Sequence, residues 1–158
     1  MAKSKDMIFV EKTLKNYKAY KAEQNNLNTL LSLIEKEKEE AIAGANLSAS
    51  IIDDMPHSRV AGTKHFKFDN DELQALEEKE KLMKSRLKYL DALLIAIDTS
   101  LNSLLERDKE IVIMFYIKRK SLVEIADHVS LSRDHVFKVK TGLICYVTKS
   151  LKVFNYDV

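Results

Sequence analysis

An apolar repeat in the second half of the chain limits most strongly what this protein can fold into. Its members follow one another at alternating three- and four-residue steps without a slip: Leu73, Leu76, Glu80, Met83, Leu87, Leu90, Leu94, Ile97, Leu101 and Leu104. Only Glu80 is not apolar. Five consecutive heptads of this kind predict a long helix whose stripe is buried against another helix. Asp69 or Asn70 can cap its start, with acidic residues in the first turn.

A second, weaker stripe precedes it and predicts another long helix over residues 6–43. Its members are Met7, Val10, Leu14, Tyr17, Leu27, Leu31 and Ile34. Gly44 is expected to end this helix. Residues 44–68, which include Pro56 and Gly62, are expected to form an irregular loop, and a loop of that length is usually functional or disordered.

The composition favours an all-α fold. The 158 residues include only three Gly and one Pro, and 46% apolar beside 32% charged residues suits amphipathic helices. We expect a helical hairpin or coiled coil over residues 1–104 and a DNA-binding domain over residues 105–158. The two long helices could fold back on each other or pair with another chain. Because each stripe has to be buried, a homo-oligomer is predicted.

Several classes of protein are disfavoured. The single cysteine, Cys145, excludes an internal disulfide and fits a reducing compartment. No apolar run approaches the roughly 20 residues that span a bilayer, and the N-terminus has no signal-peptide pattern. The four histidines lack metal-ligand spacing, and no Gly-rich phosphate loop is present. We therefore expect a cytoplasmic protein without cofactor, metal or enzymatic activity.

Positive charge gathers near the C-terminus. Residues 118–152 hold eight Lys or Arg and three acids, whereas residues 1–104 are nearly balanced, with 16 basic and 17 acidic residues. A polyanion would therefore be bound at the C-terminal end, if at all.

The segment SLVEIADHVSLSRDHVFKVK (121–140) indicates where. After an apolar helix over residues 107–118, Ser121 and Glu124 form a capping-box pattern, a short helix runs through His128, and Ser132 caps a helix that reaches about Leu151. Two helices that cross steeply over a short turn make a helix-turn-helix. The crossing needs a small residue, Ala126, and an apolar wedge, which is supplied by Leu122, Ile125, Val129, Leu131, Val136 and Val139. Two departures are Ser130, where such motifs often have glycine, and Gly142 inside the last helix.

A helical wheel with Val136, Val139 and Leu143 facing inward predicts the DNA-binding residues. In this motif the N-terminal residues of the second helix, here 132–142, meet base edges in the major groove. Arg133 and Lys138 suit guanine, and Asp134 could accept from cytosine. The remaining candidates at this helix are Ser132, whose free backbone N–H groups would face a phosphate, with His135, Phe137 and Thr141. Phosphate contacts are expected from Lys118, Arg119, Lys120 and Lys140, beside the cap Ser121.

Residues 105–151 resemble region 4 of sigma factors in their leading apolar helix, the SLVEIA segment and the Ser-initiated recognition helix. The whole chain is similar to phage late-gene transcriptional regulators of the ArpU/RinA type, which have a loop containing DMP, here Asp54, Met55 and Pro56. The resemblance implies a phage or prophage activator in a bacterial host cell that binds promoter DNA. The family's recognition helix carries over onto Ser132 to Thr141 only.

Other interpretations remain open. A phage small terminase subunit combines a helix-turn-helix with oligomerising helices, although usually in the opposite order. The long helices could instead be the functional part, in contact with host RNA polymerase, and the C-terminal helices a mere packing unit. Basic loop residues could add a second DNA contact or belong to a solvated linker; these are Arg59, Lys64, His65 and Lys67.

Overall fold

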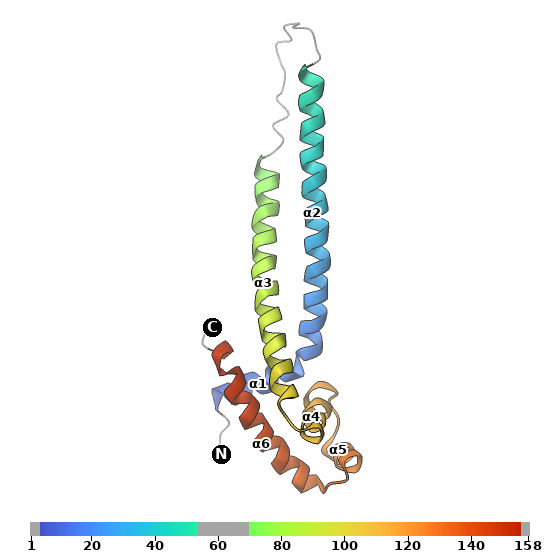
Figure 1. The fold of residues 1–158 in the computed structure, drawn as a ribbon, viewed down its shortest axis with the longest axis vertical. Coiled ribbons are helices and arrows are strands. Elements are labelled where there is room, and N and C mark those ends of the chain that lie inside the picture. The colour runs from blue at the N-terminus through green and yellow to red at the C-terminus, as the bar shows by residue number, and fades with distance from the viewer. Residues whose placement is uncertain (1–3, 54–69, 156–158) are drawn as a thin grey trace. The chain divides into compact units, whose positions relative to one another are not determined.

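The computed structural model describes residues 4–53 and 70–155, and its regular elements there are all helical, so the all-α prediction is confirmed (Figure 1). The elements in chain order are α1 (Lys5–Lys15), α2 (Tyr17–Asp53), α3 (Asn70–Asn102), α4 (Glu106–Val112), the π-helix η1 (Ile113–Ile117), α5 (Leu122–Val129), α6 (Arg133–Leu151) and the 3₁₀-helix η2 (Lys152–Asn155). The expected caps, turns and basic residues of segment 54–69 lie outside the described residues.

The chain divides into two compact units. The first unit combines Met1–Gln24 with Tyr89–Val158, and the second consists of Asn25–Lys88. This division differs from the boundary expected between residues 104 and 105. The physical reason is that α1 and the last turns of α3 share a hydrophobic core with the C-terminal helices.

The prediction of one uninterrupted helix over residues 6–43 is wrong at both ends. Ser4 caps α1 by accepting a hydrogen bond from the Met7 backbone N–H at 3.2 Å, and α1 ends at Asn16, whose φ of −94° and ψ of 3° are not helical. α2 then begins at Tyr17 and continues through Gly44 to Asp53. Glycine costs a helix roughly 1 kcal/mol relative to alanine but does not by itself stop one.

The core of the first unit explains why the chain bends at Asn16. Val10 and Leu14 of α1 are buried in one cluster with side chains of α3, η1 and α6, and Figure 1 shows α1 beside α6. The other buried members are Leu93, Ile97, Leu101, Val112, Tyr116, Ile144, Val147 and Leu151. A straight helix would carry α1 away from this core. The Tyr17 hydroxyl donates to Asp98 Oδ1 at 2.6 Å and fastens the start of α2 to α3 within the same unit.

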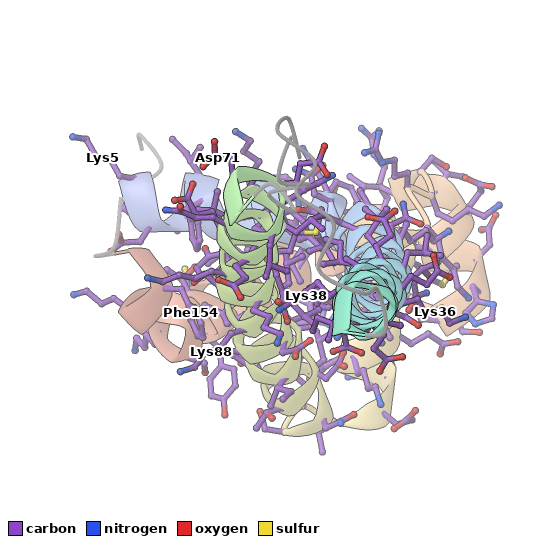
Figure 2. All side chains as sticks on the ribbon, turned by 90° about the horizontal axis from the view of Figure 1, so that it is seen from above. Lys5, Lys36, Lys38, Asp71, Lys88 and Phe154 are labelled. Atoms are coloured by element: carbon purple, nitrogen blue, oxygen red, sulfur yellow. The ribbon has the colours of Figure 1, made fainter. Side chains whose placement is uncertain are left out.

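The second unit consists of the remainder of α2 and the first part of α3, which lie side by side (Figure 1). The non-apolar member of the heptad repeat, Glu80, is nearly buried and forms ion pairs with Lys38 of α2, at 2.7 Å, and with Lys84 of α3. Figure 2 shows Lys38 directed into the space between the helices, whereas Lys36 points away from α3. Hydrogen bonds from Lys38 and Lys84 lower the pKa of Glu80 to about 2. A charged residue therefore fits this stripe because a lysine on each helix neutralises it.

Candidate nucleic-acid interface

The turn before α5 has the predicted capping box. The Glu124 backbone N–H donates to Ser121 Oγ at 3.3 Å, and the Ser121 backbone N–H donates to Glu124 Oε2 at 2.8 Å. These bonds satisfy backbone donors that a helix start leaves open, so α5 begins sharply at Leu122. Ser121 itself is exposed at this helix start.

A short turn joins α5 to α6. Ser130 adopts the left-handed conformation, with φ of 54° and ψ of 44°, and the Leu131 backbone N–H donates to the Ala126 carbonyl at 3.0 Å. Ser132 then caps α6 by accepting from the His135 backbone N–H at 3.2 Å. The chain thus makes the left-handed turn that sequence reasoning associated with glycine, using serine instead.

A second small core holds α5 and α6 together. Ile111, Met114, Ile125, Ala126 and Val136 are buried in it. Every expected wedge residue is present, because the partly buried side chains packed against this cluster include Leu122, Val129, Leu131 and Val139. The orientation of α6 relative to α5 is therefore determined by packing and by two serine caps.

The predicted base-reading residues lie on the exposed part of α6. Arg133, Asp134, His135, Lys138 and Thr141 are all exposed, and Phe137 is 52% exposed. In the part of the chain that the structure describes, the Arg133 and Lys138 side chains form no hydrogen bond or ion pair. Their charges are uncompensated within the first turns of α6. Thr141 Oγ1 donates to the Phe137 carbonyl at 2.9 Å, as threonines inside helices often do.

Lys140 is not where a phosphate contact requires it. Its side chain is only 9% exposed, and its Nζ lies over the ring of Phe115, 4.1 Å from the centroid, and over that of Phe137 at 5.1 Å. The wheel was drawn slightly wrong: the buried face of α6 follows Val136, Lys140 and Ile144 at four-residue steps. Aromatic ring faces attract the ammonium group and offset part of its loss of hydration.

The basic turn, residues 118–120, follows an element that sequence reasoning missed. The predicted helix over 107–118 is α-helical as α4 and then widens into the π-helix η1, where the Lys118 backbone N–H donates to the Ile113 carbonyl at 2.9 Å. Such π segments occur often at functional sites. Arg119 follows in the left-handed region with φ of 55°.

The three cations of the basic turn are exposed but differ in their partners. Lys120 Nζ donates to Glu124 Oε1 at 3.0 Å. The Ser121 backbone N–H and this lysine lower the pKa of Glu124 to about 2. Arg119 Nη2 donates to the Lys15 carbonyl at 3.4 Å, which leaves its charge uncompensated. Lys118 forms no hydrogen bond or ion pair with any described residue.

The contact between α1 and the basic turn could not be read from the sequence. The Tyr116 hydroxyl donates to Glu11 Oε1 at 3.0 Å, across about a hundred residues of chain. Burial, together with Glu11, raises the pKa of Tyr116. The signal available in the sequence was only an ordinary apolar stripe in residues 6–14. The first unit therefore contains three parts of a candidate surface: α6, the basic turn and the end of α1.

Neither a metal centre nor a membrane span is found in residues 4–53 and 70–155. No cluster of three or more His, Cys, Asp or Glu there could hold a metal ion, and no described helix is long and apolar enough to cross a membrane. His128 Nε2 is instead hydrogen-bonded to Glu110 Oε1 at 2.6 Å. Comparison of the chain with protein-family models, curated proteins and solved structures gave no match. The resemblance to sigma region 4 and to phage late-gene regulators stays a prediction.

Proposed function

We propose that this chain binds double-stranded DNA sequence-specifically, reads the major groove with α6 and regulates transcription. The observation that carries the proposal is the pair Arg133 and Lys138. Both are exposed, both lack a partner among the described residues, and both belong to a helix held by a serine cap and a packed core. Long cationic side chains without intramolecular partners are available to a ligand.

The chemistry of α6 suits a base-reading helix. Arg133 and Lys138 can donate to guanine O6 and N7, and Asp134 can accept from cytosine N4. The free N–H groups at the start of α6, beside Ser132, suit a phosphate. In this proposal α5, the left-handed turn and α6 form a helix-turn-helix of the sigma region 4 type, and the basic turn contacts the DNA backbone.

Fluorescence anisotropy with labelled fragments of the source genome tests the proposal, with random duplex as competitor over a salt series. The variants are Arg133→Ala and Lys138→Ala, and Lys36→Ala is the matched control because it also loses one exposed positive charge. Each α6 substitution is expected to weaken binding to a preferred fragment by about 1–3 kcal/mol, whereas the control leaves it unchanged. Binding that shows no fragment preference and is unaffected by both α6 substitutions would refute the proposal.

Regulation itself needs a separate measurement. In the proposal the protein is a phage or prophage late-gene activator, not an enzyme, and contacts host RNA polymerase. Transcription in vitro from a promoter that contains the preferred fragment should rise with added wild-type protein but not with Lys138→Ala. Sedimentation equilibrium tests the predicted homo-oligomer. A dimer on a palindromic site fits a regulator, whereas a ring would favour the terminase alternative.

A further inference from the structure

The last turn of α1 lies against the basic turn, although about a hundred residues separate them in the sequence. Two hydrogen bonds join them: the Tyr116 hydroxyl donates to Glu11, and the Arg119 guanidinium donates to the Lys15 carbonyl. Val10 and Leu14 are buried in the same core as Tyr116. The position of α1 in the first unit is therefore supported by packing as well as by polar contacts.

This contact brings unpaired positive charges together. Lys12 and Lys15 are the basic residues of the last turn of α1, and both are exposed. Neither side chain forms a hydrogen bond or ion pair with any described residue, and the same is true of Lys118 in the basic turn. Arg119 meets a carbonyl oxygen and not a carboxylate. The acid in this part of α1, Glu11, already accepts the hydrogen bond from Tyr116.

We propose that the last turn of α1 is a second phosphate-binding surface, continuous with the basic turn, through which Lys12 and Lys15 hold the backbone of the duplex that α6 reads. The inference rests on the proposed function, since it assigns further residues to the same DNA complex. The segments KTLK (12–15) and KRK (118–120) contain no aromatic side chain on which a base could stack. Cations without such a platform suit phosphate oxygens, which position a protein without reading sequence.

A structural role for these lysines is the competing explanation. Positive side chains near the C-terminal end of a helix interact favourably with its dipole, and this would require no ligand. In that case the loss of both lysines would lower the thermal stability of the protein, but the salt dependence of DNA binding would stay the same. Affinity, its salt slope and thermal stability must therefore be measured on the same variants.

The experiment uses the full chain with Lys12→Ala/Lys15→Ala and measures anisotropy on the preferred and the random duplex over a salt series. Each lost phosphate contact should lower the slope of log K against log salt by about 0.9, which corresponds to roughly eightfold weaker binding at 0.1 M relative to 1 M salt. Both duplexes should be affected equally. Lys12→Arg/Lys15→Arg should restore binding, and Lys36→Ala/Lys88→Ala, which also removes two exposed charges, should leave the slope unchanged.

The outcomes separate this inference from the proposed function. If Arg133→Ala and Lys138→Ala weaken binding but Lys12→Ala/Lys15→Ala leaves the slope unchanged, the inference is overturned and the proposed function stands. Loss of thermal stability without a change in slope overturns it as well. If the wild-type protein binds no duplex, both are overturned. An equal loss on both duplexes, restored by the arginine variant, supports the inference.

Discussion

Ser130 and Gly142 each occupy a backbone position that suits the other's residue type. Ser130 is left-handed, with φ of 54° and ψ of 44°, and its exposed side chain forms no hydrogen bond with any described residue. Gly142 is exposed inside α6, and a Cβ built on it would meet no atom within 4 Å. The expectation that Gly142 allows close packing is therefore not supported within the described residues. Exchanging the two residue types should stabilise the first unit.

The magnitude follows from backbone energetics. A left-handed conformation costs an L-residue about 1–2 kcal/mol, and the greater chain freedom of glycine in the unfolded state offsets about half of that. Ser130→Gly should therefore raise the free energy of unfolding by about 0.5–1 kcal/mol. Gly142→Ala should add about 0.8–1.0 kcal/mol. The two sites share no contact, so the double variant should approach the sum, about 1.5–2 kcal/mol.

Urea denaturation followed by circular dichroism measures these changes, with Gly44→Ala as a control for the same substitution in the second unit. The midpoint should shift without a change in slope, because neither substitution alters the surface that unfolding exposes. A loss of stability in Ser130→Gly would refute the left-handed turn between α5 and α6. A loss of stability in Gly142→Ala would show that this face of α6 packs against something.

Three further predictions concern the polar groups of the core. Glu80→Gln should remove a pH dependence of stability: because the pKa of Glu80 is lowered to about 2 by Lys38 and a second lysine, the wild-type contribution is complete above the usual value of 4.5 and is lost as the pH falls toward 2, which acid titration by circular dichroism would show. Lys140→Met should leave the salt slope of DNA binding unchanged because the amine is buried, and a lower slope in anisotropy would restore it as a phosphate contact. Tyr116→Phe should lower the free energy of unfolding by about 1.5–3 kcal/mol, since it removes a hydrogen bond to the carboxylate of Glu11, and an unchanged urea midpoint would contradict that bond.

The features that could be predicted from the sequence are those whose causes are local. The capping box at Ser121 and the cap at Ser132 depend on side chains within three residues of the backbone groups they bind. The wedge around Ala126 follows from helical spacing in a short segment. The start of α3 at Asn70 likewise follows from a long regular repeat. Agreement between caps, spacing and the small residue made these expectations reliable.

The features that could not be predicted depend on contacts distant in the sequence. The break at Asn16 arises because α1 packs against the C-terminal helices, and nothing in residues 6–43 contains that information. Leu93 lies off the heptad stripe but is buried, because the last turns of α3 belong to the larger core of the first unit. Lys140 was assigned to solvent by its charge, whereas the rings of Phe115 and Phe137 make a buried position tolerable.

The π-helix connects the parts of the candidate surface. Phe115 and Tyr116 are adjacent, and their rings pack edge to face with centroids 4.9 Å apart. Phe115 receives Lys140 of α6, while Tyr116 donates its hydroxyl hydrogen to Glu11 of α1. Two neighbouring residues of η1 thus contact the helix proposed to read bases and the helix proposed to hold phosphates, and the basic turn begins directly after them. Since η1 is shorter than two helical turns, a change in its winding would displace all three elements together. The extra residue of the π turn is therefore best understood as the feature that determines how α1, the basic turn and α6 are spaced along one duplex.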